Sequence, residues 1–265
     1  MRTIDINECH AILLDLAKEL HRLCVSHNIP YVMIGGTMLG AIRHKGFIPW
    51  DDDMDFGIPR KYFKEFISIA EKELNPNYRL RNRYNSKLIH LDMLKLEDAR
   101  TTIEEKHNEL ATEKIGINID IFPLDYGNGS HSLFSRNTLI FNMIRMVTFE
   151  YSNDSNISYP KKIIVKLAKI LKPVSPDFLS NYVEKNSKRH ENGSFLTNYY
   201  GLYKFKEIVP KKLWGTPQPY KFEDAEFFGP ECYDAYLCHF YKKYMELPPE
   251  NKRHTHLERA YWNEK

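Results

Sequence analysis

The chain has 265 residues, a formal net charge of +3 at pH 7 and an aromatic content of 13%. This length can bury a full hydrophobic core, and the apolar and aromatic content excludes a largely disordered protein. The small net charge argues against nucleic acid as the main partner. We find no signal peptide, no apolar run long enough to cross a bilayer and no metal-ligand spacing among the four cysteines, which predicts a cytoplasmic protein with reduced thiols.

The first half of the chain is predicted to alternate helices and strands. Apolar residues recur with helical spacing over residues 6–27, and Asp5 followed by Glu8 is typical of a helix N-cap with its reciprocal partner. The elements expected next are a strand at 31–34, a short helix at 37–42, a loop at 47–52, a strand at 53–58, a helix at 59–74, and strands at 78–81, 90–97 and 115–122.

The second half is predicted to be mainly helical, with helices at 132–150, 161–171, 176–191 and 231–245. The predicted fold class is therefore α/β (α+β), in which residues 1–128 form a mixed β-sheet core and residues 129–265 form a mainly helical region packed against it. Segment 151–156 is the best candidate for a lid loop. The lysine face of helix 161–171 fits either ordinary solvation, which we favour, or contact with an anionic membrane surface.

A glycine pair and an acidic run follow the first predicted strand. Gly35 and Gly36 stand at a strand-to-helix turn, where phosphate oxygens can approach backbone N–H groups. Asp53 and Asp55 alternate with apolar residues, which places both carboxylates on one face of a strand. Two such carboxylates repel unless a cation lies between them, and hard oxygen ligands select Mg²⁺ or Mn²⁺. A phosphate cradle beside a metal site indicates phosphoryl or nucleotidyl transfer.

Further carboxylates could complete this metal site. Asp120 alternates with isoleucines in the predicted strand 115–122, on the same face as Asn118, and could supply a third ligand. The alternative for Asp120 is a solvated residue of an edge strand. Asp51 is a lesser candidate ligand, for which a solvated turn is about equally expected.

These motifs carry a resemblance to a known family. Residues 35–37 together with 53–56 resemble the signature of the nucleotidyltransferase superfamily, and the longer string 35–57 is similar specifically to the LicD family. That family includes bacterial phosphorylcholine transferases and is related to the fukutin-type ribitol-phosphate transferases. The likeness continues over 119–125 and recurs near the C-terminus at 222–223, 230, 241, 244–250 and 253–254.

The resemblance implies transfer of a substituted phosphate, such as phosphocholine, from a CDP-activated donor to a glycan hydroxyl. The acceptors in such enzymes include teichoic acid precursors and lipopolysaccharide, so a place at the inner face of the membrane is compatible with it. Asp53, Asp55 and Asp120 would hold Mg²⁺ or Mn²⁺, with Asp120 acting as a ligand or as the base. Thr37 stands where the superfamily often has Ser and retains the hydroxyl, so Gly36 and Thr37 are still expected to bind phosphate.

Basic residues near these motifs are candidates for binding donor phosphates. Arg43, His44 and Lys45 lie between the glycine pair and the acidic strand, where they could neutralise a leaving CMP. A solvated surface role is an equal alternative for Arg43 and the favoured one for the other two. Lys95 could bind phosphate or form a salt bridge, and Arg253 could contact the donor or clamp the C-terminal segment.

Two other functions stay open on the residues alone. A nucleotidyltransferase that moves NMP from an NTP to a small molecule or sugar would use the same glycines and carboxylates. A non-catalytic binding protein has no need of three convergent carboxylates. A choline head group would require aromatic faces, for which Trp50, Tyr126, Tyr199, Tyr200 and Trp214 are candidates without an assignment.

Overall fold

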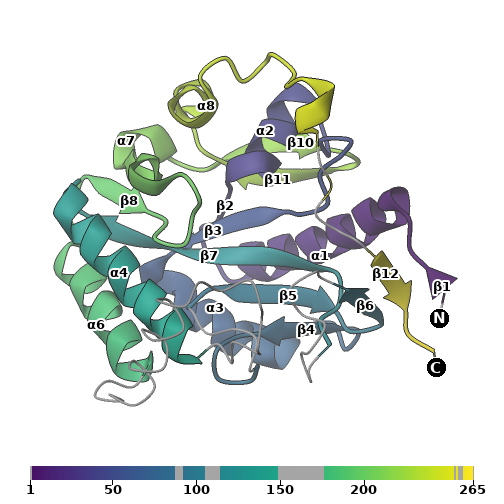
Figure 1. The fold of residues 1–265 in the computed structure, drawn as a ribbon, viewed down its shortest axis with the longest axis horizontal. Coiled ribbons are helices and arrows are strands. Elements are labelled where there is room, and N and C mark those ends of the chain that lie inside the picture. The colour runs from purple at the N-terminus through teal and green to yellow at the C-terminus, as the bar shows by residue number, and fades with distance from the viewer. Residues whose placement is uncertain are drawn as a thin grey trace, which may run out of the picture.

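The computed structural model describes residues 2–86, 92–104, 114–148, 176–253, 255 and 259–264, and its central feature is a seven-stranded sheet (Figure 1). Five strands follow the order β2-β3-β7-β5-β4, and β8 and β9 extend the sheet from β7. β3 and β7 run parallel and the other pairs run antiparallel, which confirms the predicted α/β class with a mixed sheet. The bounds are β2 Val32–Met33, β3 Asp55–Pro59, β4 Tyr78–Arg81, β5 Leu94–Asp98, β7 Asn118–Gly127, β8 Phe195–Thr197 and β9 Ile208–Pro210.

Two helices pack against this sheet and against each other. α1 (Ile6–Ser26) contacts β5 and β7, and α3 (Arg60–Glu73) contacts β3, β4 and β7. The predicted cap of α1 is confirmed, because the Asp5 carboxylate accepts the N–H of Glu8 at 2.9 Å. The Glu8 carboxylate pairs with Arg2 at 2.7 Å, a contact that the sequence pattern did not predict.

Apolar residues of the central strands fix which face of the sheet can carry polar groups. Phe56, Ile121 and Leu94 are paired across β3, β7 and β5, and each is at most 1% exposed. Because successive side chains point to opposite faces of a strand, the neighbouring residues Asp55 and Asp120 lie on the other face. Burial of the apolar set therefore directs both carboxylates to the same side.

The second half of the described chain is not mainly helical, which corrects the prediction. It contains α4 (His131–Thr148), α6 (Pro176–Arg189), α7 (Lys211–Trp214) and α8 (Tyr233–Tyr241), but also five strands. Besides β8 and β9, these are β10 (Gln218–Phe222), β11 (Ala225–Gly229) and β12 (Arg259–Trp262). Strands of three to five residues are too short for apolar periodicity to reveal them.

Two of these strands also pair with partners far away in the sequence. β12 lies between β1 (Arg2–Thr3) and β6 (Thr101–Glu104) in a three-stranded sheet, and β8 pairs with β7. Because β1 and β12 pair, the termini of the described chain lie close together, on the same small sheet (Figure 1).

Two short 3₁₀ helices, η1 (Lys204–Glu207) and η2 (Glu250–Lys252), complete this half.

Other predicted elements differ from the structure mainly at their ends. The helix predicted at 37–42 begins two residues earlier, as α2 (Gly35–Arg43), and the strand predicted from residue 53 begins at 55. The predicted helix 161–171 and lid loop 151–156 fall outside the described residues. No helix of the part of the chain that the structure describes is long and apolar enough to span a membrane.

A buried ion pair joins the start of α3 to β7. Arg60 donates from Nε and Nη2 to the two carboxylate oxygens of Asp125, at 2.9 and 2.8 Å, and from Nη1 to Asp92 at 3.2 Å. Asp125 is fully buried, so either charge would be stranded without the other. Asp125 is part of the string that resembles the LicD family, and in the structure it anchors the helix to the sheet.

Segments from the two ends of the chain meet beyond the β2 edge of the sheet. α2 contacts β3, α8 and β10, and β11 contacts β2, so that these elements form a group at the top of Figure 1. The glycine pair that begins α2 therefore lies close to residues about two hundred positions later in the chain.

Gly40 allows the loop after α2 to fold back onto the helix. Its carbonyl oxygen accepts the N–H groups of His44 at 2.8 Å and Gly46 at 3.4 Å. A Cβ atom at Gly40 would lie 2.5 Å from the carbonyl oxygen of Gly46, which is closer than real contacts allow. This loop leads to the acidic run, so the close approach helps to position the site.

Gly40→Ala is expected to lower the free energy of unfolding by about 1–3 kcal/mol, because the new methyl group overlaps a backbone oxygen that moves only with the loop. Urea unfolding measures the effect. Gly127→Ala is the matched control, since a Cβ there meets Thr197 Oγ1 at 3.5 Å, an ordinary contact. Equal losses at the two positions would contradict the argument.

Candidate active site

The glycine pair forms the first turn of α2 and packs directly against carboxylates. Gly35 has a φ of +55°, and a Cβ atom there would lie 3.5 Å from Asp55 Oδ2. A Cβ atom on Gly36 would lie 3.0 Å from Asp51 Oδ2, so a side chain at Gly36 would crowd this carboxylate. The Thr37 hydroxyl accepts the backbone N–H of Asp55 at 2.7 Å. Residues 35–37 therefore hold the helix N-terminus next to the acidic run.

Strand register brings three of the predicted site residues together. Asp55 on β3 pairs directly with Asp120 on β7, and Asp120 pairs directly with Lys95 on β5, so the three side chains share one face of the sheet. The Lys95 ammonium donates to Asp120 Oδ1 at 2.6 Å and to Asn118 Oδ1 at 2.9 Å. Lys95 thus forms the salt bridge that was the alternative to phosphate binding.

The sequence predicted Asp53 on a strand, but in the structure Asp53 lies just before β3 and is exposed. β2 is only two residues long and pairs with Phe56 and Gly57, so the paired strand begins beyond Asp53. Asp53 nevertheless remains electrostatically linked to the site: it hydrogen-bonds with Asp51 and acts on Asp55. It reaches the site from the loop.

Burial and the charges of neighbouring carboxylates raise the pKa values of Asp51 and Asp55. Burial, with the charges of Asp53 and Asp52, raises the pKa of Asp51 to about 8. Burial, followed by the charges of Asp53, Asp120 and Asp51, raises the pKa of Asp55 well above its usual range, and Lys95 opposes this only in part. Negative charge is therefore concentrated here without full compensation from the protein.

The donor set fits a divalent cation in its chemistry, although the described residues contain no group of three or more His, Cys, Asp or Glu side chains arranged to hold a metal. Two carboxylates are adjacent, because Asp55 and Asp120 are paired in register. Among the described residues a third carboxylate does not join them in a ligand group, because Asp53 lies outside the strand, and Asp120 Oδ1 already binds Lys95. The oxygen ligands are of the kind that Mg²⁺ prefers.

The comparisons with known proteins identify the family. The family model described as "LicD/FKTN/FKRP, nucleotidyltransferase domain" matches residues 28–171, which is more than half of the chain. The chain belongs to this family. It is also 27% identical over 276 aligned positions to "Lipopolysaccharide cholinephosphotransferase LicD" of Haemophilus influenzae, and the alignment covers 98% of this chain and 99% of that protein. It is thus a LicD-family transferase.

Two uncharacterized rickettsial proteins match shorter parts of this LicD-family chain. The protein from Rickettsia typhi is 40% identical over 70 residues, which is 26% of this chain and 23% of that one. The protein from Rickettsia prowazekii is 52% identical over 46 residues, 17% of each. These local matches add nothing about the substrate.

A second group of predicted residues lies around Trp50 in the LicD-family chain. The Arg253 guanidinium stacks over the Trp50 ring at 4.9 Å, and the His44 ring meets the same ring edge-on at 6.3 Å. Arg43 donates to the carbonyl oxygens of Tyr244 at 2.9 Å and Glu246 at 3.3 Å. Arg43 thus secures the segment after α8, and Arg253 and Trp50 brace each other.

Arg43 interacts electrostatically with the acidic run. Burial and the neighbouring Arg253 lower the pKa of Arg43, whereas Tyr241 and Asp51 oppose this shift. Lys45 contributes through its backbone: its φ is +60° and its carbonyl oxygen accepts the N–H of Glu223 at 2.8 Å. Arg43 therefore interacts electrostatically with Asp51, while its hydrogen bonds go to backbone carbonyl groups.

Three tyrosines that sequence reasoning did not assign complete the surroundings of Asp55. The Tyr236 hydroxyl accepts the N–H of Gly35 at 3.2 Å, and the Tyr241 hydroxyl would lie 3.8 Å from a Cβ atom on Gly35. Tyr203 hydrogen-bonds with Tyr241. No local sequence signal connects these residues with the glycine pair, because they belong to elements about two hundred positions away; only the family-like string included Tyr241.

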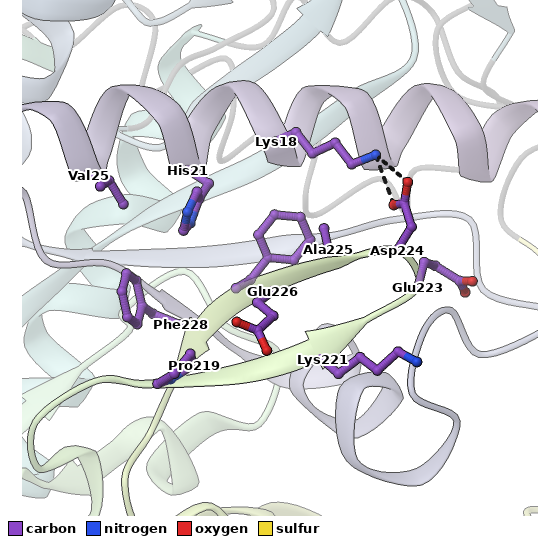
Figure 2. A pocket seen from close by; sticks show the side chains of 11 residues that line it. Lys18, His21, Val25, Pro219, Lys221, Glu223, Asp224, Ala225, Glu226 and Phe228 are labelled. Atoms are coloured by element: carbon purple, nitrogen blue, oxygen red, sulfur yellow. Dashed lines mark hydrogen bonds and ion pairs between the residues drawn. The ribbon is translucent and has the colours of Figure 1, made fainter.

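A groove of about 790 Å³ lies elsewhere, between α1 and the β10–β11 hairpin (Figure 2). Lys18 pairs with Asp224 at 2.9 Å across it, and His21, Phe227 and Phe228 line it. A smaller cavity of about 400 Å³ continues past Phe47. Neither is lined by a predicted site residue.

A buried glutamate lies under the Tyr203 segment and predicts a pH dependence of stability. Burial raises the pKa of Glu207 to about 7, and the Tyr203 N–H, 3.2 Å from Oε1, opposes the shift. A raised carboxyl pKa gives stability that is complete below the unfolded-state pKa near 4.5 and is lost as pH rises through 7.

Glu207→Gln is expected to be more stable than the wild type at pH 8, by up to about 3 kcal/mol, and the advantage should vanish near pH 4.5. Thermal unfolding at a series of pH values measures the difference. Glu246→Gln, at a carboxylate with a side chain that is 69% exposed, is the control and should show little pH-dependent difference. A constant difference between wild type and Glu207→Gln at all pH values would contradict the assignment.

Proposed function

We propose that the chain transfers a phosphocholine-type group from a CDP-activated donor to a hydroxyl of a glycan such as lipopolysaccharide or a teichoic acid precursor. The near-full-length similarity to the cholinephosphotransferase of Haemophilus influenzae supports this substrate class. The observation that carries the chemistry is the pairing of Asp55 with Asp120 beside the N-terminus of α2. A carboxylate pair and an adjacent helix N-terminus are both suited to phosphoryl transfer.

In this proposal Asp51, Asp53, Asp55 and Asp120 hold Mg²⁺ or Mn²⁺. When bound, the metal ion neutralises charge on the phosphate oxygens. Its chemical fit rests on the concentrated negative charge that raises the pKa values of Asp51 and Asp55.

The remaining roles belong to the side chains and backbone of the protein. The positive end of α2, at Gly36 and Thr37, faces the donor phosphate. The acceptor hydroxyl attacks the phosphorus that carries the choline ester, the bond to CMP breaks, and the hydroxyl proton passes to Asp120 if Asp120 is the base. Lys95 orients the Asp120 carboxylate by its 2.6 Å ion pair, and Arg43 neutralises the leaving CMP.

Product analysis separates this reaction from nucleotidyl transfer. With Mg²⁺ and lipopolysaccharide as acceptor, we expect CDP-choline to be consumed with release of CMP and labelling of the glycan. Anion-exchange chromatography detects the nucleotide. Consumption of CTP with release of pyrophosphate, and no use of CDP-choline, would establish the alternative of NMP transfer.

Removing either paired carboxylate tests the catalytic assignment. Asp55→Asn and Asp120→Asn are each expected to lower the turnover of CDP-choline by about three orders of magnitude, because metal ions supply several kcal/mol of charge stabilisation in the transition state. Asp224→Asn, at an exposed carboxylate of the β10–β11 turn, is the control and should keep full turnover.

Thermal unfolding should show Asp55→Asn folded and, in metal-free buffer, at least as stable as the wild type, because the change removes like-charge repulsion. Unchanged turnover in either site variant would overturn the proposal.

A further inference from the structure

Two aromatic rings form a corner beside the acidic run. The Tyr203 ring lies 5.6 Å from the Tyr241 ring at an interplanar angle of 86°. Perpendicular neighbours present faces in two directions, as the walls of a corner do. Tyr203 is 42% exposed, so its ring borders solvent, whereas Phe240, which packs beneath it, is 5% exposed and belongs to the core.

The corner adjoins the group proposed to react. The backbone of Gly35 separates them: a Cβ atom there would lie 3.5 Å from Asp55 Oδ2 and 3.8 Å from the Tyr241 hydroxyl. A group esterified to a phosphate near Asp55 would reach these rings.

Charges of the protein do not already use these faces. Among the described residues, cations lie over the rings of Trp50 and Tyr126, but none over those of Tyr203 or Tyr241. Lys206 donates to the backbone carbonyl oxygen of Phe240 at 2.7 Å. The exposed Tyr203 ring is thus available to a cation from outside.

The aromatic residues considered from the sequence fit this role less well. Tyr126, Tyr199 and Trp214 are each only 6% exposed and belong to the core, and the Trp50 ring is occupied by the Arg253 guanidinium. Tyr200 packs against the second hydrophobic cluster, with Phe134, Val183 and Tyr199.

We propose that Tyr203 and Tyr241 bind the quaternary ammonium group of the donor and so determine which substituted phosphate is transferred. This inference rests on the proposed function and adds the identity of the carried group. A trimethylammonium group has no N–H to donate, so aromatic faces and nearby carboxylate charge are the means to recognise it. A polyol, by contrast, needs hydrogen-bond partners and gains little from aromatic faces.

The test measures donor binding by calorimetry with Mg²⁺ present, for CDP-choline, CDP-ethanolamine, CDP-glycerol and CMP. The wild type is expected to bind CDP-choline about 10-fold more tightly than CDP-glycerol, with CDP-ethanolamine between them. Tyr203→Leu should remove about 5- to 10-fold of this preference while CMP binding stays within about 2-fold. Tyr203→Phe, which keeps the ring, should retain the preference. Tyr233→Leu, at an exposed tyrosine of α8 that contacts Tyr220, is the matched control and should behave as wild type.

The outcomes separate this inference from the proposed function. Equal wild-type affinity for CDP-choline and CDP-glycerol, or a choline preference that survives Tyr203→Leu, would overturn the aromatic site and leave the transferase proposal standing. No binding of any CDP compound or CMP by the wild type would overturn both. If Tyr203→Leu fails to fold, the wild-type donor series and Tyr203→Phe still decide, because loss of preference in Tyr203→Phe would assign recognition to the hydroxyl and not to the ring.

Discussion

The structure depends on the parallel pairing of β3 with β7. This register sets Asp55 directly against Asp120 and is held in place on the other face by Phe56 and Ile121, which are completely buried. A slip by one residue would move each carboxylate to the apolar face, where an unpaired charge is strongly disfavoured. Hydrophobic packing on one side of the sheet therefore maintains repulsion between carboxylates on the other.

That repulsion has no advantage for folding. The raised pKa values of Asp51 and Asp55 show that the fold opposes the charged forms of these groups, and Lys95 compensates only part of the charge. Asp125, which is also buried, has a partner in the guanidinium of Arg60, with two hydrogen bonds of 2.8–2.9 Å. Asp51 and Asp55 have no such bidentate partner among the described residues, which is why the proposed chemistry is placed there.

Sequence reasoning predicted that Asp55, Asp120 and Lys95 lie near one another because the signals around them are local. Alternation around Asp55 and Asp120 predicted which residues face the core, and the glycine pair indicated a helix close by. The helix begins at Gly35, two residues earlier than predicted, and Asp53 lies outside the strand. The same reasoning failed for the second half. Strands such as β8 and β9 are three residues long and pair with each other or with β7, so their identity is fixed by tertiary partners and not by their own periodicity.

The proposed aromatic site was missed for a related reason. Tyr203 and Tyr241 follow no periodic pattern that separates them from the other tyrosines of the chain. The place of Tyr241 beside Gly35 and the packing of Tyr203 on Tyr241 both depend on tertiary structure. Arg43 was predicted as a candidate for binding donor phosphates, but its hydrogen bonds to the carbonyl oxygens of Tyr244 and Glu246 depend on a segment two hundred residues away. Sequence proximity cannot reveal such a partner.

The hydrogen bond from the Gly35 amide to the Tyr236 hydroxyl has a practical implication for the choice of fragments. The family model ends at residue 171, so a protein truncated there would retain the carboxylates yet lack the acceptor that holds the first amide of α2. Its phosphate-facing turn would lose a restraint, and its glycine backbone would become open to water. Assays on truncated proteins of this kind would therefore underestimate the activity of the intact enzyme.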